Sequence, residues 1–520
     1  MDRRNQPDYD NGKSKSINGS KTTKSTYIKI IIRNLFIGIL LMLVLNTIRF
    51  TSKQPKVEIL SPDHVDSYTT LSDIELAHRL AKATTFKTIS FGESPEFDQY
   101  EPEFLKFHQF LRETFPKVHQ YLNLNIIANY SLVYHWKGLD EQSLKPILLA
   151  GHIDVVPTLF LDKWTHPPFA GIVDETYIWG RGTMDDKGSV MAILESVEDL
   201  LRQGFKPQRS IYLAFGHDEE LGGNTGAHNI NKYFNKNQIG PFEYILDEGL
   251  PILLPPVFPG LSKPIASVGI TEKGAMDIRL SVTIVGGHSS MPRRESAIGV
   301  LAKAVSKLEN NPPSPKLRET RLLFDFVGRE CSLPYRFLFS NLWLFEPVIS
   351  RVLASKPTLD ALQRTTTALT IFNAGNKANV IPMEASATIN FRIAPGDTTN
   401  DIIEHVNRVI GDDRVVISKV SNVIEPAPVS STNSPAFNLL QSTILQEFPD
   451  VVVAPTIMIA NTDTRHYWNL TENIFRFCPM VLENIDLQRL HGIDERLTIK
   501  NYKQLVDFYY HLIKNGERFL

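Results

Sequence analysis

Three consecutive acidic residues, Asp218, Glu219 and Glu220, follow closely after an apolar run at residues 211–215. Such a run is typical of a buried strand, so the acids lie near the end of that strand. Carboxylates this close repel one another, and removing any of them from water costs several kcal/mol unless a cation or a proton compensates. The cluster therefore predicts a bound positive charge.

Acids and histidines also stand near the ends of other predicted strands. The segments in question are PILLAGHIDVVP with His152 and Asp154, YIWGRGTMDDKG with Asp185 and Asp186, and FEYILDEG with Asp247 and Glu248. A helical pattern at residues 188–201 separates two of these strands, and strand–helix alternation predicts an α/β fold. In such sheets ligands bind beyond the carboxyl ends of the strands, so we expect the clusters to converge.

Converging imidazole and carboxylate groups suit Zn²⁺, with Mn²⁺ or Co²⁺ as alternatives. Any one cluster alone is more often a turn or a satisfied polar residue, so the prediction depends on all of them together with His491 in LHGIDER. The two cysteines, Cys331 and Cys478, are too few for a thiolate zinc site or a disulfide framework, and we expect two free thiols rather than one bridge.

The length and composition of the chain favour a large globular protein. The chain has 520 residues, of which 42% are hydrophobic, and this length predicts two globular domains. Its 55 basic and 57 acidic residues give a formal net charge of -2, so nothing in the overall charge favours nucleic acid as a partner.

The N-terminus carries the one break in composition. Residues 1–27 are polar and predict a disordered cytoplasmic tail, whereas residues 28–50 are apolar enough for a signal anchor if Lys29 and Arg33 reach the headgroups. The basic residues ahead of the span predict a single-pass type II protein with a lumenal or extracellular catalytic part. A cleaved signal peptide, and hence secretion, is the alternative.

Residues 51–72 predict a polar stalk beyond the anchor. Two N-glycosylation sequons follow, at Asn129 and Asn469, and these can be used only in a secretory compartment. They agree with the predicted topology, although such sequons arise often by chance.

The chain resembles the co-catalytic di-zinc hydrolases that include aminoacylase-1, carboxypeptidase S and succinyl-diaminopimelate desuccinylase. The resemblance is carried by six motifs that occur in the order of that family: GHIDVVP, GRGTMDDKG, GHDEE, LDEG, GGHSS and HGIDE. The resemblance runs from about Asp73 to the C-terminus. Within that family, SNLWLFEPVISR, RTTTALTIF and INFRIAPG are most similar to the secreted animal enzymes that hydrolyse and form N-fatty-acyl amino acids.

The resemblance implies the fold and the domain limits. It implies a zinc exopeptidase-like α/β catalytic domain, with a mixed, largely parallel sheet covered by helices on both faces. An α+β lid domain that forms a homodimer would be inserted into it. The implied limits are 73–268 and 423–520 for the catalytic domain and 269–422 for the lid.

The resemblance also implies two Zn²⁺ ions per subunit and a role for each matching residue. The implied ligands are Asp185 as the bridge, His152 and Asp247 on one ion, and Glu220 and His491 on the other. Glu219 would be the general base, and Asp154 would orient the imidazole of His152. Asp186, His217 and Asp218 are expected to be structural.

Substrate contacts are implied in the lid and in one late loop. His288 would reach across the dimer to stabilise the oxyanion, and Asn379 and Arg392 would hold a substrate carboxylate. The loop ANTDTRHYW would contact substrate, with Ala460 where relatives usually have glycine. The apolar stretch at 324–362 is either a packed helix or an acyl-chain channel, in which case Trp343 and Phe345 would favour long chains.

The implied reaction is hydrolysis of the amide bond of an N-(fatty-)acyl amino acid that carries a free carboxylate, and the same site could run in reverse. A metallocarboxypeptidase acting on short peptides shares every residue named above and is the alternative. A non-catalytic zinc-binding scaffold is a third hypothesis, which the retention of all five ligands and Glu219 disfavours.

Overall fold

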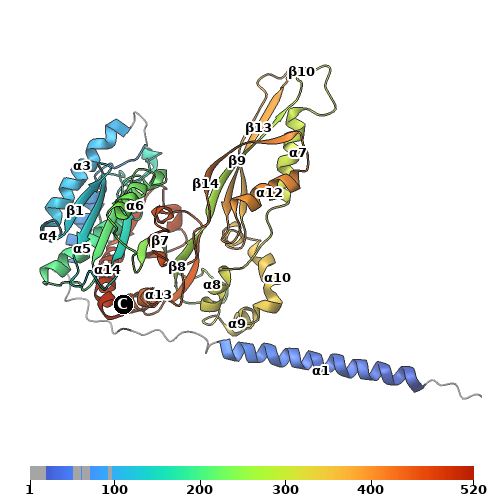
Figure 1. The fold of residues 1–520 in the computed structure, drawn as a ribbon, viewed down its shortest axis with the longest axis horizontal. Helices are drawn as coiled ribbons and strands as arrows, with labels where there is room; N and C mark the ends of the chain where they lie inside the picture. The colour runs from blue at the N-terminus through green and yellow to red at the C-terminus, as the bar shows by residue number, and fades with distance from the viewer. Residues whose placement is uncertain (1–18, 51–59, 61–70, 92–96, 520) are drawn as a thin grey trace, which may run out of the picture.

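The computed structural model describes residues 19–50, 60, 71–91 and 97–519. Two globular parts follow one long N-terminal helix (Figure 1). Most of the predicted tail and stalk lies outside the described residues. The helix α1 (Gly19–Phe50) begins before the predicted anchor, so residues 19–27 are helical. Its segment Thr26–Phe50 is, by length and composition, long and apolar enough to cross a membrane.

The first part contains an eight-stranded sheet with the order β1-β2-β6-β3-β7-β16-β8-β15. The strands are β1 (Asn123–Ile127), β2 (Ser131–Trp136), β3 (Ile147–His152), β6 (Ile211–Gly216), β7 (Ile245–Leu253), β8 (Ile265–Glu272), β15 (Val452–Met458) and β16 (Ile474–Leu482). Pairs β6–β3, β3–β7, β7–β16 and β8–β15 are parallel, which confirms the predicted mixed α/β sheet.

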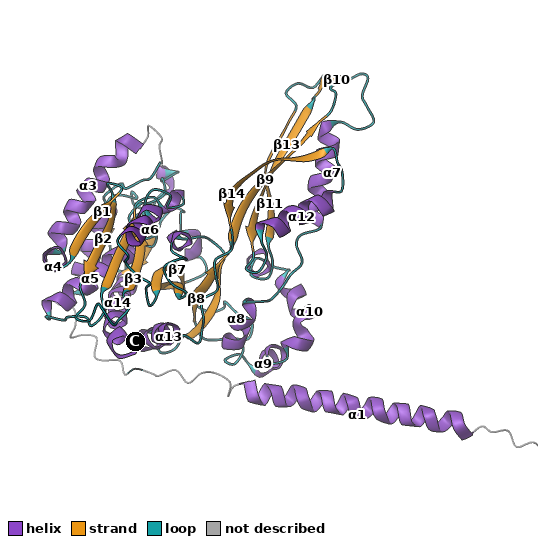
Figure 2. Ribbon diagram, viewed as in Figure 1, coloured by secondary structure: helices purple, strands orange, loops and turns teal. Residues whose placement is uncertain are grey.

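Helices cover both faces of this sheet (Figure 2). Leu149 of β3 packs in one core with α2 (Asp73–Thr84), α5 (Lys187–Arg202) and α14 (Ile499–Phe519), whereas Leu148 packs in another with α6 (Ala227–Lys236). The other elements of this part are α3 (Phe97–Thr114), α4 (Pro116–Tyr121), α13 (Pro435–Glu447), β4 (Ile172–Val173), β5 (Tyr177–Trp179), β17 (Arg496–Thr498), and the 3-10 helices η3 (Leu161–Lys163), η4 (Glu219–Leu221), η5 (Asp463–His466) and η6 (Asp486–Gln488). Because both faces are covered, β3 is apolar along its whole length before His152.

The second part is a four-stranded antiparallel sheet with the order β11-β13-β9-β14. The strands are β11 (Thr366–Ala374), β13 (Glu384–Ile393), β9 (Gly274–Thr283) and β14 (Val415–Ile424). Alternate residues of β9, such as Ile278 and Leu280, pack with α7 (Ala297–Asn310) and α12 (Thr399–Ile410) in a separate core. A short ribbon of β10 (Gly287–His288) and β12 (Val380–Ile381) forms its far end (Figure 2).

Four helices that the sequence assigned to the lid pack on the first part instead. They are α8 (Thr320–Val327), α9 (Leu333–Phe339), α10 (Leu342–Leu353) and α11 (Pro357–Asp360). Their apolar residues, including Phe324, Phe339 and Ile349, belong to the large core of the first part. Within the expected lid range 269–422, these helices therefore share the core of the first part rather than that of the four-stranded sheet.

Candidate metal centre and active site

Acidic and histidine side chains converge where β3, β6 and β7 meet. His152 is the last residue of β3, Glu219 and Glu220 form η4 directly after β6, and Asp185 lies just before α5. Since β6, β3 and β7 are parallel neighbours, their carboxyl ends share one edge of the sheet. The predicted convergence is found.

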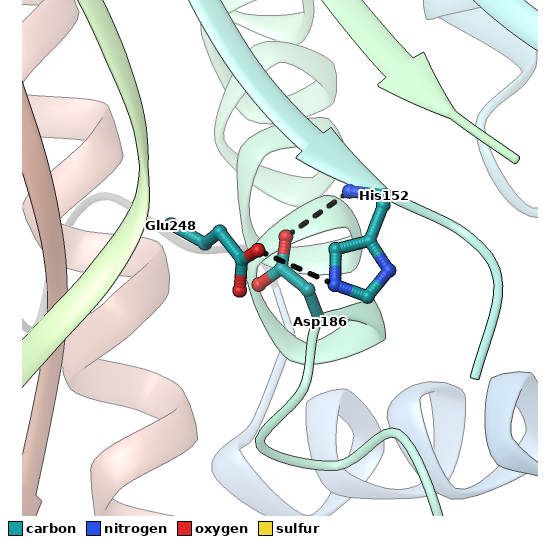
Figure 3. A group of neighbouring side chains, drawn as sticks. All are labelled: His152, Asp186 and Glu248. Atoms are coloured by element: carbon teal, nitrogen blue, oxygen red, sulfur yellow. Dashed lines mark hydrogen bonds and ion pairs between the residues drawn. The ribbon is translucent and has the colours of Figure 1, made fainter. Parts of the chain in front are cut away.

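His152 is held by carboxylates on several sides. Its Nε2 lies 3.0 Å from Asp185 Oδ1. The same atom lies 3.5 Å from Glu248 Oε1, and the backbone N–H of His152 donates to Asp186 Oδ2 at 3.2 Å (Figure 3). Its Nδ1 lies 3.3 Å from Asp154 Oδ1. The imidazole is almost completely buried. Its orientation is therefore fixed, with Nε2 directed at the other acids.

Asp185 stands between two imidazoles. Its Oδ1 faces His152, and its Oδ2 lies 2.9 Å from Nε2 of His491, which is also 3.2 Å from Glu220 Oε2. Ligand atoms of His152, Asp185 and Glu220 all lie within 4.8 Å of one another, as do those of His152, Asp186 and Glu248. The two groups adjoin, which is the arrangement that a shared carboxylate between two cations requires.

Glu248, rather than the predicted Asp247, reaches the imidazole of His152. Adjacent residues in a strand point to opposite faces, and both residues belong to β7. Asp247 is buried, and its Oδ1 accepts a hydrogen bond from the backbone N–H of Glu248 at 2.9 Å. Glu248 thus joins the group of candidate ligand atoms around His152, whereas Asp247 has one buried carboxylate oxygen, Oδ2, without a partner among the described residues.

Asp154 holds two parts of the site together. Besides facing His152, its carboxylate accepts hydrogen bonds from Ser90 Oγ at 2.7 Å and from the backbone N–H groups of Glu219 and Glu220 at 3.1 and 3.2 Å. One buried carboxylate thus orients the imidazole and also fixes η4.

Glu495 was not predicted, although it lies in the quoted HGIDE motif. Its Oε1 accepts hydrogen bonds from the backbone N–H groups of Gly182, Met184 and Asp185, at 3.0, 2.8 and 3.2 Å. The carboxylate is fully buried and pairs with Arg181. The motif that supplies His491 therefore also fixes the loop that carries Asp185.

Glu219 faces the cleft and is paired with a residue that sequence reasoning did not assign. Its Oε1 accepts a hydrogen bond from Nη2 of Arg465 in η5 at 3.0 Å. Burial, together with the charge of Glu248, raises the pKa of Glu219 well above its ordinary value. Arg465 lies in the loop ANTDTRHYW, which the sequence had marked for substrate contact. A direct pairing across 246 positions leaves no local pattern in the sequence.

The charges of the cluster are not balanced by the protein alone. Burial is the main reason that the pKa of Glu248 is raised well above its usual range and that of Asp186 to about 8. The buried atoms Asp186 Oδ1, Glu220 Oε1 and Asp247 Oδ2 have no hydrogen-bond partner among the described residues. Carboxylate and imidazole donors left in this state fit divalent cations such as Zn²⁺.

The cleft beside this cluster has two kinds of wall. A cavity of about 240 Å³ is lined by the acidic residues of the cluster and by several apolar side chains, namely Pro251, Met458, Met480, Leu482 and Leu490. A wider hollow of about 1040 Å³ shares Glu219, Glu220 and His491 with it, and it is lined by Arg392 and Arg465. Arg392 Nη1 donates to Asn461 Oδ1 at 2.8 Å, so this predicted residue reaches the site.

His288 and Asn379 do not join the cluster within one chain. They lie together at the β10–β12 ribbon, where the backbone N–H of Ser289 donates to the carbonyl of Asn379 at 3.2 Å. Figure 1 places this ribbon at the far end of the second part. Trp343 is exposed and lines neither hollow beside the cluster, and Phe345 packs against the first core.

An acid and a histidine expected to be bystanders, Asp218 and His217, have structural contacts. Asp218 accepts hydrogen bonds from the backbone N–H groups of Thr225 and Gly226 at 2.8 and 2.7 Å, which fixes the turn after η4. His217 Nδ1 lies 2.6 Å from Ser131 Oγ. Both cysteines are free and buried, in agreement with the expectation of two thiols.

Known proteins share this sequence and this fold. The model of peptidase family M20/M25/M40 matches residues 148–515. A probable carboxypeptidase S-like 2 of Dictyostelium discoideum is 90% identical over the full length of both chains. The N-fatty-acyl-amino acid synthase/hydrolase PM20D1 of Xenopus tropicalis is 41% identical over 85% of this chain and 86% of the relative.

Solved structures agree on the fold. The family M20 metallo-carboxypeptidase Sso-CP2 of Sulfolobus solfataricus matches with a TM-score of 0.61 at 16% identity, over 86% of this chain and all of that one. The YXEP protein of Bacillus subtilis, described as a dinuclear metal binding peptidase, matches with a TM-score of 0.52 at 13% identity, over 86% and 99% of the two chains. The converging cluster, the matched family model and these relatives together show that the chain belongs to peptidase family M20/M25/M40 and is a hydrolase.

Proposed function

We propose that this chain is a two-metal amidohydrolase that cleaves N-acyl amino acids carrying a free carboxylate, with long-chain fatty-acyl groups among its substrates. One observation carries the proposal: the cluster adjoins two connected hollows, one lined by Arg392 and Arg465 and the other lined in part by apolar residues such as Met458 and Met480. Such a cleft matches a substrate with a carboxylate on one side of the scissile amide and a hydrocarbon chain on the other. The relatives named N-fatty-acyl-amino acid synthase/hydrolase support it.

Two Zn²⁺ ions per subunit would fit the cluster. The proposed ligands are His152 and Glu248 for one ion, Glu220 and His491 for the other, and Asp185 for both; the predicted ligand Asp247 would then help to fix the backbone of Glu248. When bound, the ions would polarise the scissile carbonyl and lower the pKa of an attacking water. Asp186 lies close enough to His152 and Glu248 to shape the first of these sites.

Side chains of the protein would transfer the proton of the attacking water and stabilise the developing negative charge. Glu219 would accept the proton of the attacking water and deliver it to the leaving amine, a contribution of about 10²–10⁴-fold in rate. Arg465 would hold the Glu219 carboxylate in position, since their hydrogen bond is 3.0 Å long. His288 and Asn379 would come from a second copy of the chain, because neither reaches the cluster in its own subunit. The active form would then be a homodimer through the lid.

A carboxypeptidase acting on short peptides is the second candidate. The 90% identical relative is named a probable carboxypeptidase S-like protein, and this favours it. Both candidates use the carboxylate wall and the cluster in the same way. They differ in what the apolar wall receives, a fatty chain or the side chains of a peptide.

The N-terminal helix would anchor the enzyme. We propose a single-pass type II arrangement with the catalytic part in the lumen or outside the cell, because Lys29 and Arg33 lie toward the N-terminal end of the apolar span. A cleaved signal sequence would leave the same catalytic part soluble.

Replacing Arg392 by Gln should lower kcat/KM roughly 10- to 100-fold for free-acid substrates, because a charge-assisted hydrogen bond is worth about 1.5–3 kcal/mol. For the same substrates with the α-carboxylate converted to a carboxamide, the variant should match the wild type. The check is steady-state kinetics on both series. Arg279→Gln, an exposed arginine on the neighbouring strand, serves as the control. Equal losses on acid and amide would remove Arg392 from carboxylate recognition.

Turnover of two substrates separates the two candidates. The zinc-loaded full chain, in detergent, is given N-oleoyl-phenylalanine and a blocked dipeptide with a free carboxylate of similar polarity. A higher kcat/KM on the lipid conjugate supports the acyl-amino-acid proposal and assigns the apolar wall to the chain. A higher value on the dipeptide makes the protein a carboxypeptidase.

A further inference from the structure

The C-terminal end of α1 is docked on the globular part through buried polar contacts. Asn46 Nδ2 donates to Asn341 Oδ1 at 3.0 Å, and Asn341 Nδ2 donates to the carbonyl of Leu43 at 3.2 Å. Thr47 Oγ1 lies 3.0 Å from Ser340 Oγ. Asn341 is completely buried, and its side-chain amide also donates to the carbonyl of Phe337 in α9 at 2.9 Å, so one buried side chain bonds to both α1 and α9. These bonds fix where α1 meets the junction of α9 and α10 (Figure 1).

Apolar and cation–π contacts complete this docking. Phe50 is buried within the large core of the first part, and the guanidinium of Arg329 lies 5.5 Å from the centre of its ring. The earlier part of the helix differs, because Leu35, Phe36 and Leu40 are exposed. Only the last two turns of α1 therefore belong to the globular fold, and the remainder has the surface of a membrane span.

This division sets the height of α9 and α10 relative to a bilayer. The apolar segment Thr26–Phe50 has 25 residues. At 1.5 Å per residue it is about 37 Å long, against roughly 30 Å for a hydrocarbon core. Its last two turns, from Leu43 on, then lie at the boundary between the hydrocarbon and the headgroups. The junction of α9 and α10 lies at the same level, since it contacts these turns directly.

The outer face of α10 is apolar although no described part of the chain covers it. Leu344, Val348 and Val352 follow one another at a spacing of four, so they lie along one side of the helix, and all three are exposed. Trp343 beside them is 53% exposed. The opposite side of the same helix, with Ile349 and Leu353, packs into the core. Because α10 is apolar on both sides, we expect its exposed side to contact a second apolar medium in addition to the core.

The charges near this face suit lipid headgroups. Glu346 is the one acidic residue of α9 and α10, and it pairs with Arg321. Arg351 is exposed next to Val352, and Leu333 at the start of α9 is 68% exposed. Tryptophan, apolar side chains and basic residues without free acids are the composition of helices that lie in a membrane interface.

We propose that the exposed apolar face of α9 and α10, formed by Leu333, Trp343, Leu344, Val348 and Val352, inserts into the interface of the same bilayer that α1 crosses. The proposal rests on α1 being a membrane span. Continuity with the docked end of α1 identifies the bilayer as the occupant, because a bilayer crossed by α1 would begin next to the junction of α9 and α10 that α1 contacts. The catalytic part is thereby held against the membrane at two places, with one orientation, instead of moving freely on a stalk.

Site-specific fluorescence in vesicles tests this contact. Val348→Cys is introduced into the full chain, labelled with nitrobenzoxadiazole and reconstituted into phosphatidylcholine vesicles. Val416→Cys on β14 of the lid is the matched control, since these valines are 60% and 55% exposed. The natural cysteines are both buried, and the unmutated chain treated with the label gives the blank. Quenching is measured with a shallow spin-labelled lipid and with a water-soluble nickel chelate.

The label at Val348 should be quenched at least threefold more by the lipid quencher, relative to the aqueous one, than the label at Val416. Equal aqueous quenching at both positions would overturn the proposal. Protection of the Val348 label from both quenchers would also overturn it, because the face would then be covered by a second copy or another protein.

A third label separates the anchor from the docking surface. Leu40→Cys lies in the exposed part of α1 and should be quenched by lipid alone. If the label at Leu40 is in lipid and the label at Val348 is in water, the proposed insertion of α9 and α10 is wrong and the proposal that α1 spans the membrane is retained. If the label at Leu40 is in water, both proposals are wrong. Turnover of N-acyl amino acids is a separate readout, so neither result affects the proposed reaction.

Discussion

Replacing Glu219 by Gln should lower kcat by about 10²–10⁴-fold without changing the metal content of the protein. The amide keeps the size of the side chain and can still contact Arg465, but it cannot accept a proton from the attacking water. Steady-state kinetics and elemental analysis of the same sample provide the measurement.

Glu175→Gln, an exposed residue of the same domain, is the matched control and should keep both properties. Unchanged turnover in Glu219→Gln would remove Glu219 as the base. Loss of metal together with turnover would instead make Glu219 a ligand. The roles proposed for Glu219 as base and Glu220 as ligand would then have to be exchanged.

Replacing Glu248 by Gln should abolish turnover and release at least one metal equivalent, whereas Asp247→Asn should retain both ions. The reason is geometric: the Glu248 carboxylate lies 3.5 Å from the imidazole of His152, while Asp247 accepts a backbone hydrogen bond that an Asn side chain can also accept. Both variants are dialysed, analysed for metal and titrated with Zn²⁺, and circular dichroism verifies that each is folded.

The opposite pattern would contradict the assignment. Retention of two ions by Glu248→Gln, with loss of one in Asp247→Asn, would restore Asp247 as the ligand. It would also mean that the orientation of β7 changes when the metals bind.

Much of the site follows from sequence because its residues stand at the ends of consecutive strands. Parallel strands place their carboxyl ends at one edge, so His152 and Glu220 could be brought together without coordinates, whereas Asp185 lies in the loop between β5 and α5, and β5 belongs to a separate three-stranded sheet. The choice between Asp247 and Glu248 could not be made in the same way. β7 is covered on both faces, so its sequence lacks the alternation that would show which of two adjacent acids points to the site.

Long-range packing was the other part that the sequence did not determine. The helices α8 to α10 are apolar enough to fill either core, and only the structure shows that Phe324 and Phe339 pack with the first part. The pairing of Arg465 with Glu219 joins distant loops, and the position of His288 at the end of a ribbon depends on the length of the lid strands. None of these has a local period or a cap that a sequence pattern could reveal.

The apolar stretch at 324–362 shows the same limitation for function. The sequence offered a packed helix or an acyl-chain channel, and the structure gives α10 one packed side and one exposed side. The apolar wall beside the metal cluster is made by other residues, including Met458, Met480 and Leu490. Replacing Trp343 is thus expected to change membrane contact rather than chain-length preference.

The central claim is that the cluster around Asp185 is a two-metal hydrolytic centre, and metal stoichiometry measured together with turnover tests it most directly. The purified full chain is stripped with a chelator, titrated with Zn²⁺ and assayed on an N-acyl amino acid at each step. We predict no turnover in the stripped protein and full recovery at two equivalents per chain, with His491→Ala binding only one equivalent and remaining inactive. Full turnover in the stripped protein, or saturation of the wild type at one equivalent, would contradict the account.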